Sequence, residues 1–336
     1  MELGALSIAR GISGQEGAVR ELLQDGLEGD VRVDAMGNLL ATKGKGRGLR
    51  VMLAAHMDEV GLMVSWFEKD GLLRFKTVGG MDPRILPAKA VLVGQEAVPG
   101  VIGAKPVHMQ EEEVRKKPYR IEDLFIDIGA SSREEAERMV NLGDQCTFAT
   151  AYSETEGGMI RAKALDDRAG CFLVRQVFSE EFDLELTAAF TVQEELGLRG
   201  AAVAAYSVNP EIALAIDVTS ASDTPGTDLP WQSTSLGKGP AISLMDAAGV
   251  YSRKVAGRLA EVAQSEAIPF QYKRSTRGGT DAGRIQLARE GALAATLSVP
   301  ARYIHCPASV MSREDLENTG RLLVAFLRSL EGGANL

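Results

Sequence analysis

The sequence predicts an α/β fold in which a mixed sheet lies between layers of helices, α/β/α, and is interrupted by a small β-barrel-like insertion. In the first and last parts of the chain, short apolar runs alternate with helical patterns, as expected for strands covered on both faces. From about Gly61 to Tyr152, short β-like runs are separated instead by glycines and prolines. We therefore expect one domain formed by residues 1–60 and 153–336, with residues 61–152 inserted into it as a second domain.

The individual elements follow from these patterns. Nearly continuous apolar runs predict buried strands at 51–55, 186–192, 212–216 and 293–299. Helical periodicity predicts helices at 14–24, 168–180, 247–265, 282–290 and 313–330, the last with Ser312 as its N-cap. Within the insertion we expect one helix from Ser132 to Leu142, with Ser132 and Glu135 forming a capping box and Gly143 ending the helix.

Composition limits the classes of function. The 336 residues include 37 Lys and Arg against 46 Asp and Glu, a net charge of −9, which argues against a nucleic-acid or anionic-membrane partner. The cysteines Cys146, Cys171 and Cys306 are far apart, so we expect no disulfide framework and a reducing compartment. No export leader is recognisable, and no apolar run approaches the ~18 residues of a spanning helix. These observations together predict a soluble, cytoplasmic protein.

Residues that can bind metal cluster at the ends of the predicted strands. Ligands bind beyond the carboxyl ends of strands in open α/β sheets, so these side chains should meet at one edge. The chain has only three histidines, and two of them belong to this set. Its members are His56 and Asp58 after 51–55, Glu194 and Glu195 after 186–192, Asp217 after 212–216, and His305 after 293–299. Asp166 and Asp167 precede the helix at 168–180. The third histidine, His108, lies in the insertion and is expected to be structural or exposed.

Taken one at a time, these residues have ordinary interpretations, such as helix caps, turn residues or solvated charges. Taken together, carboxylates at one edge would repel one another unless cations neutralised them. Three carboxylates, Asp166, Glu195 and Asp217, with two imidazoles suit two divalent ions such as zinc, cobalt or manganese. We therefore predict a two-metal hydrolytic centre in which one of the adjacent glutamates binds metal and the other acts as general base. Asp58 is placed to orient the His56 ring.

Seven segments resemble the motifs of the cytosolic glutamyl and deblocking aminopeptidases, including the tetrahedral (TET) aminopeptidases. They are AAHMDEVGLMV, KALDDRAG, TVQEELGLRGA, AIDVT, LGKGPAI, GGTDAGRIQLAREG and VPARYIHCP, and weaker matches extend over essentially the full chain. The resemblance implies a metallo-exopeptidase domain with two divalent ions per subunit, zinc or cobalt before manganese. His56 and Asp217 would hold one ion, Glu195 and His305 the other, Asp166 would bridge them and Glu194 would be the general base. The resemblance also implies a strained Asp166–Asp167 peptide, and which of these two residues bridges is left open.

The resemblance further implies substrates and assembly. The substrates would be peptides with a free N-terminus, and the chain would form a dimer-based homo-oligomer, such as a hollow dodecamer. The insertion would contribute dimer contacts and shape the substrate entrance. The chain departs from the family after His305, where Cys306-Pro307-Ala308-Ser309 replaces the usual Ser-Pro-x-Glu, and also at Pro300-Ala301-Arg302. The missing glutamate at Ser309 could weaken support of the metal ligands. The GGTDAG segment, residues 278–283, either caps a helix through Thr280 or Asp281 or lines the substrate pocket.

Other functions remain open from the sequence. A two-metal carboxypeptidase or acyl-amino-acid deacylase could use a similar edge of the sheet. A glycosidase is disfavoured because aromatics make up only 5% of the chain and glycoside hydrolysis needs no metal. A scaffold or metal-storing protein with a decayed site is disfavoured by the intact set of ligands. The sequence does not predict the preferred N-terminal residue of the substrate.

Overall fold

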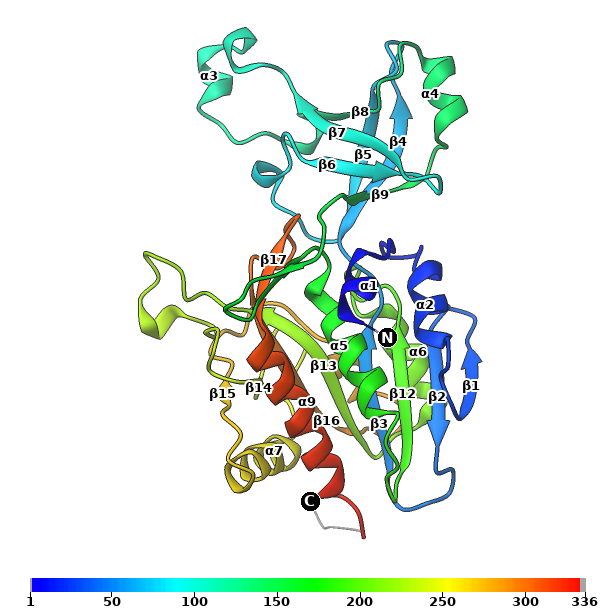
Figure 1. The fold of residues 1–336 in the computed structure, drawn as a ribbon, viewed down its shortest axis with the longest axis vertical. Coiled ribbons are helices and arrows are strands. Elements are labelled where there is room, and N and C mark those ends of the chain that lie inside the picture. The colour runs from blue at the N-terminus through cyan, green and yellow to red at the C-terminus, as the bar shows by residue number, and fades with distance from the viewer. Residues whose placement is uncertain (1, 333–336) are drawn as a thin grey trace.

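The computed structural model describes residues 2–332, which form a mixed α/β body with a closed barrel above it (Figure 1). Eleven strands of the described residues form the sheet of the body, and six antiparallel strands close the barrel. The predicted fold class is confirmed. No helix among the described residues combines the length and the hydropathy that crossing a bilayer requires.

The centre of the sheet is parallel and buried. Strands β12, β3, β13 and β16 lie side by side in parallel, so their carboxyl ends share one edge. The sheet order is β1-β2-β12-β3-β13-β16-β17-β11-β10, with antiparallel strands on either side of the centre. Strand β14 also pairs with β16, and β15 pairs with β14. The strands are β1 Asp30–Val33, β2 Leu39–Lys43, β3 Arg50–His56, β10 Ser153–Glu154, β11 Met159–Ala162, β12 Glu185–Thr191, β13 Ile212–Ser220, β14 Ala241–Ser243, β15 Gln271–Tyr272, β16 Leu293–Arg302 and β17 Ser309–Ser312.

Helices cover both faces of this sheet. Helices α5 and α9 pack on one face, with α1 against α5 and α7 against α9, while α6 and α8 pack on the other face. Ser312 caps α9 as predicted, because its Oγ accepts the Asp315 N–H at 3.4 Å. The helices of the body are α1 Leu3–Ile8, α2 Gly17–Gln24, α5 Leu165–Val177, α6 Arg199–Val208, α7 Arg253–Ser265, α8 Ala282–Ile285 and α9 Arg313–Arg328, with a 3-10 turn η4 at Leu229–Trp231.

The barrel has a hydrophobic core of its own, separate from that of the sheet. Its strand order is β4-β5-β8-β7-β6-β9, and all six strands lie within the predicted insertion. Their bounds are β4 Gly61–Phe67, β5 Leu73–Val78, β6 Ala90–Val93, β7 Val98–Ala104, β8 Leu124–Asp127 and β9 Gln145–Phe148. Between them lie η1 Pro83–Ile85, η2 Val107–Met109, α3 Glu112–Arg115, η3 Ile121–Asp123 and α4 Arg133–Met139. The division into two domains at the predicted boundaries stays a prediction.

Several local predictions need correction. The Ser132 Oγ accepts the Glu135 N–H at 3.3 Å, but the Glu135 carboxylate accepts from the N–H and hydroxyl of Ser131, so the capping box is incomplete. Helix α4 ends at Met139, before Gly143. Helix α8 is shorter than the predicted 282–290, and α1 and α6 were not predicted. Helix α6 is rich in alanine and therefore has little contrast between an apolar and a polar face.

Candidate metal centre

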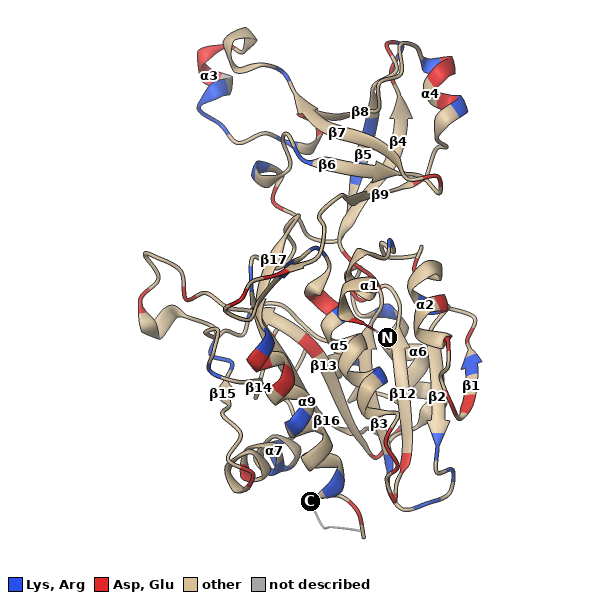
Figure 2. Ribbon diagram, viewed as in Figure 1, with Lys and Arg blue, Asp and Glu red and all other residues tan. Residues whose placement is uncertain are grey.

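The candidate residues meet at the carboxyl edge of the parallel strands. His56 is the last residue of β3, Asp217 lies inside β13 rather than after it, and Asp166 is the second residue of α5. The adjacent glutamates lie in the loop after β12, and His305 lies between β16 and β17. Figure 2 shows acidic positions at the start of α5 and within β13, at the end of the sheet that faces the barrel. Six of the predicted residues line one cavity of about 1200 Å³: His56, Asp166, Glu194, Glu195, Asp217 and His305.

The Asp166 carboxylate lies between the two histidines. Its Oδ1 is 3.3 Å from the His56 Nε2, and its Oδ2 is 3.6 Å from the His305 Nε2. The Glu195 Oε2 is 3.2 Å from the same His305 nitrogen. The Glu194 Oε2 is more distant from the His56 Nε2, at 3.9 Å. Asp166 therefore has one oxygen toward each imidazole, the arrangement of a bridging carboxylate.

Both imidazole rings are held by backbone carbonyls. The Nδ1 of His56 lies 3.0 Å from the carbonyl oxygen of Asp58, and the Nδ1 of His305 lies 3.0 Å from that of Gly80. A carbonyl oxygen can only accept a hydrogen bond, so each Nδ1 carries the hydrogen. The lone pair of each ring is then on Nε2, which faces the carboxylates and is free to bind a metal.

Asp167 lies beside these groups but differs from Asp166 in its contacts. The peptide bond between the two residues is cis, and both have non-helical backbone angles at the start of α5. The Asp167 Oδ2 accepts the His56 N–H at 3.1 Å, and its Oδ1 accepts the Gly170 N–H at 2.9 Å. Ligand atoms of His56, Asp167 and Asp217 lie within 4.8 Å of one another, as do those of His56, Asp166 and Glu195. Both oxygens of Asp167 therefore accept backbone N–H groups, whereas the oxygens of Asp166 face the two imidazoles.

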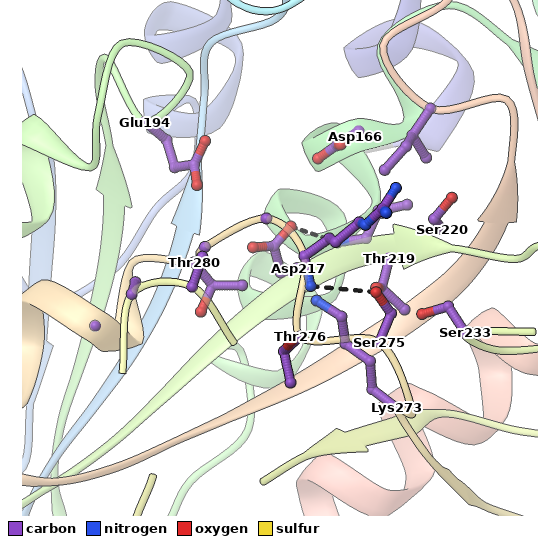
Figure 3. Close-up of a pocket in the computed structure, with 18 of the residues that line it drawn as sticks. Asp166, Glu194, Asp217, Thr219, Ser220, Ser233, Lys273, Ser275, Thr276 and Thr280 are labelled. Carbon is purple, nitrogen blue, oxygen red and sulfur yellow. Dashed lines mark hydrogen bonds between the residues drawn. The ribbon is translucent and has the colours of Figure 1, made fainter. Parts of the chain in front are cut away.

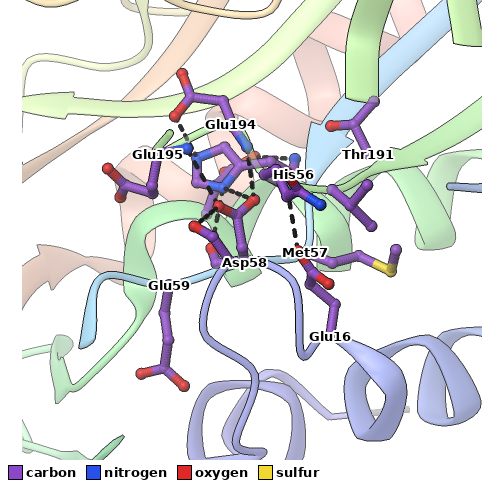
Figure 4. A network of polar contacts seen from close by, with 12 residues as sticks. Glu16, His56, Met57, Asp58, Glu59, Thr191, Glu194 and Glu195 are labelled. Atoms are coloured by element: carbon purple, nitrogen blue, oxygen red, sulfur yellow. Dashed lines mark hydrogen bonds and ion pairs between the residues drawn. The ribbon is translucent and has the colours of Figure 1, made fainter. Parts of the chain in front are cut away.

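Asp58 acts on the glutamates more than on the histidine (Figure 4). Its carboxylate is fully buried, and its Oδ1 and Oδ2 accept the backbone N–H groups of Glu194 and Glu195 at 3.0 and 3.1 Å. The Ser13 hydroxyl donates to the same Oδ2 at 2.6 Å. The His56 Nδ1 donates to the backbone carbonyl oxygen of Asp58, 3.0 Å away, whereas the Asp58 Oδ1 is 3.5 Å from the same nitrogen. The sequence prediction for Asp58 was therefore incomplete: the carboxylate mainly fixes the loop that carries both glutamates.

The cluster brings several buried carboxylates close together, and their mutual repulsion makes it a favourable site for cations. Burial raises the pKa of Glu194 and of Glu195 well above the ordinary glutamate value, and neighbouring carboxylates raise both further. Burial likewise raises the pKa of Asp217 to about 7. Burial acts to lower the pKa of His56, but the carboxylates of Glu194 and Asp166 outweigh it and raise that pKa. Divalent cations would offset the repulsion, and the mixed imidazole and carboxylate donors suit them. The residues present therefore fit a metal centre.

Other predicted positions have clear outcomes. The backbone turn of GGTDAG lines the cavity, through Gly278, Gly279, Thr280 and Gly283 among others. The capping interpretation of Asp281 is wrong, because its side chain makes no cap hydrogen bond and instead accepts from the Thr191 hydroxyl at 2.5 Å. Ser309 is buried and donates to the Tyr303 carbonyl at 2.9 Å. Cys306 is a half-buried free thiol, and His108 is exposed in the barrel.

Sequence reasoning missed two groups at this site. The Gly80 carbonyl comes from the barrel, and no sequence signal connects it to His305, which is 225 residues away. The second group is the basic segment 273–277, KRSTR, which lines the cavity. Three cations in five residues are a visible signal, although such a run is usually a solvated surface.

Comparison with known proteins identifies a family. The family profile described as M42 glutamyl aminopeptidase matches residues 37–322. The chain belongs to this family. It is 37% identical to the lysyl aminopeptidase of Pyrococcus furiosus over 337 residues, covering 96% of this chain and 94% of the relative. The structure matches the TET aminopeptidase of a Thaumarchaeota archaeon with a TM-score of 0.94 at 34% identity, covering 98% and 96% of the two chains. It also matches the TET1 peptidase of Pyrococcus horikoshii with a TM-score of 0.88 at 36% identity, covering 98% of both chains.

Family membership confirms the predicted resemblance and the predicted class of reaction. The chain is a metal-dependent aminopeptidase, and so a peptide hydrolase. This result favours the aminopeptidase over the carboxypeptidase, deacylase, glycosidase and scaffold alternatives. Divalent metals are its cofactor class, and the cluster around Asp166 is where the described residues can hold them.

Proposed function

We propose that Asp166 bridges two divalent ions, zinc or cobalt before manganese, with His56 and Asp217 on one ion and Glu195 and His305 on the other. The position of Asp166 between the two Nε2 atoms is the observation that carries this proposal. The close Glu195–His305 pair and the grouping of His56 with Asp217 also support it. When bound, such ions supply Lewis-acid activation of water and of the scissile carbonyl.

Glu194 is the general base of the proposed reaction. It lines the cavity and lies farther than Asp166 from the His56 Nε2, which leaves its carboxylate available to a water molecule. Asp58 holds its backbone N–H, so the carboxylate starts from a fixed position. Glu194 takes a proton from the attacking water and gives it to the nitrogen of the leaving peptide. Carboxylates of the centre also attract the free α-amine of the substrate, which restricts cleavage to the first peptide bond.

The test combines metal analysis with kinetics. Glu194→Gln should keep the metal content of the wild type but lower kcat by about 10²–10⁴-fold, the usual contribution of a general base. His305→Ala should lose at least one ion per subunit by elemental analysis. His108→Ala is the matched control, because this exposed histidine lies in the barrel. Near-wild-type kcat in Glu194→Gln, or an unchanged metal content in His305→Ala, would contradict the proposed roles.

We also propose a homo-oligomer built from dimers, such as a dodecamer, that works on peptides in the reducing cytoplasm. The TET1 peptidase of Pyrococcus horikoshii can assemble into a tetrahedron or a large octahedral shell, and the likeness of this chain to it supports assembly here. In this proposal residues 1–60 and 153–336 form the catalytic domain, while residues 61–152 make dimer contacts and shape the entrance. A sedimentation mass near one chain mass would contradict the assembly.

The first residue of the substrate is not decided by family membership. The family description names glutamyl substrates, whereas the Pyrococcus furiosus relative is named for lysyl substrates. These side chains carry opposite charges, so the residues of this chain's own cavity must decide between them.

A further inference from the structure

Away from the metal centre, the cavity wall is cationic. The only acidic residues that line the cavity in the described part of the chain are the four that belong to the candidate centre. Four cations line the same cavity: Lys273, Arg274, Arg277 and Arg284. This is a local reversal of sign in a chain whose net charge is −9. Within residues 2–332, none of the four forms an ion pair with a carboxylate, so their charges are not neutralised by the protein.

Among these four cations, Lys273 is the one held inside the cavity. Arg277 and Arg284 are exposed, and the exposed Arg274 donates to the Leu229 carbonyl at 3.1 Å. Lys273 is half-buried, and its backbone N–H donates to the Ile242 carbonyl at 3.0 Å, which continues the pairing of β15 with β14. Figure 3 shows its side chain extending between Thr276 and Ser275 in the direction of Asp217.

Hydroxyl groups complete the surroundings of Lys273. Thr219, Ser233 and Ser275 line the same cavity, and Figure 3 draws them on the side of the cavity that carries Lys273. Thr219 follows Asp217 by two residues in β13, so both side chains lie on the same face of the strand, about 6–7 Å apart along it. That separation is comparable to the reach of a glutamate side chain. A substrate held at the metal centre by its first peptide bond can therefore place a side-chain carboxylate beside Lys273.

We propose that Lys273, with the hydroxyls of Thr219, Ser233 and Ser275, binds the side-chain carboxylate of an acidic N-terminal residue, so that peptides beginning with Glu or Asp are preferred. The inference rests on the proposed function, because it uses the same cavity. An ammonium group and three hydroxyls can all donate hydrogen bonds to a carboxylate, and charge-assisted bonds are the strongest of this kind. A leucine side chain would leave the Lys273 ammonium without a partner in the cavity, and a lysine side chain would be repelled by it.

The test is a panel of aminoacyl-p-nitroanilides with Glu, Gln, Asp, Leu and Lys, run on the metal-loaded protein. Glu and Gln have nearly the same shape, so the ratio of their kcat/KM values measures the charge contribution. We expect a ratio of at least about tenfold in favour of Glu. Lys273→Met should bring this ratio close to one, and Lys273→Glu should move the preference toward Lys. Lys45→Met is the matched control, because Lys45 is exposed in the turn between β2 and β3, at the opposite end of the sheet (Figure 1).

Failure of this inference is distinguishable from failure of the proposed function. Cleavage of Leu or Lys substrates with a Glu-to-Gln ratio near one would overturn the inference while leaving the aminopeptidase roles intact. A high ratio that persists in Lys273→Met would also overturn it. If no member of the panel is cleaved, the proposed roles fail, and calorimetric binding of L-glutamate against L-glutamine still decides the inference. Tighter binding of glutamate that is lost in Lys273→Met supports it, and equal binding of the two amino acids refutes it.

Discussion

Replacing Asp58 by Asn tests how the loop of Glu194 and Glu195 is held. The Asp58 carboxylate accepts three hydrogen bonds, two from these backbone N–H groups and one from Ser13. An Asn side chain has one acceptor oxygen, and its NH₂ group would face an N–H donor. The change therefore removes one charge-assisted hydrogen bond and leaves a buried donor unpaired, a loss of about 3 kcal/mol in the free energy of unfolding. With an unfolding entropy of about 2.1 cal/mol/K per residue, that loss lowers Tm by about 4 °C.

The assay is denaturant unfolding at fixed protein concentration, together with kcat and metal content. We expect Asp58→Asn to lower kcat by about 10–100-fold, because the base-bearing loop loses its anchor. Ser13→Ala is the graded control, since it removes only the hydroxyl donor and should cost about 1 kcal/mol. If Asp58→Asn loses no more stability than Ser13→Ala, the carboxylate does not hold the loop and the reasoning is refuted.

Three further predictions concern two glycines and one buried lysine. At Gly170 an added Cβ would lie 2.3 Å from the Asp167 Oδ1, so Gly170→Ala should lower the free energy of unfolding by about 1–3 kcal/mol and reduce metal content. Gly257→Ala, in a helix where nothing lies within 4 Å of the added carbon, should instead stabilise by about 0.5–1 kcal/mol in the same denaturant titration. Burial lowers the pKa of Lys163 to about 8, below its ordinary 10.5, so between these values the unfolded chain binds more protons than the folded one. The free energy of unfolding of the wild type, measured relative to Lys163→Met, should then rise with pH from about 8 to 10.5; a flat or falling difference would show that Lys163 keeps an ordinary pKa.

The sequence predicted the strands of the parallel centre because each is a continuous apolar run covered on both faces. It placed the end of the 212–216 strand too early, since β13 continues through residues 217–220, three of which are polar, by pairing with β16. Hydrophobic patterning cannot detect that extension, because backbone hydrogen bonds rather than apolar side chains maintain it. The edge strands are short and partly exposed, so they carry too little apolar patterning to be predicted.

For the candidate site, the sequence predicted the residues but not their hydrogen-bond partners. We could predict that the histidines and carboxylates meet, because most of them follow a predicted strand and the carboxyl ends of parallel strands share one edge of the sheet. The partners of those residues were not predictable. The Asp58 carboxylate meets N–H groups more than 130 residues away, and Lys273 enters the cavity only because β15 pairs with β14. Such contacts depend on tertiary packing, which local sequence patterns do not encode.

Through the carbonyl of Gly80, the barrel contributes a hydrogen-bond acceptor to one of the proposed metal ligands, His305. Gly80 lies just after β5, and its oxygen sets the hydrogen position on the His305 ring from across the junction of the two parts. An excised sheet body would therefore keep every proposed ligand in its sequence and still lose the hydrogen bond at the Nδ1 of His305. Chimaeras that exchange barrels between relatives should therefore preserve the loop that carries Gly80 before any other part of the insertion.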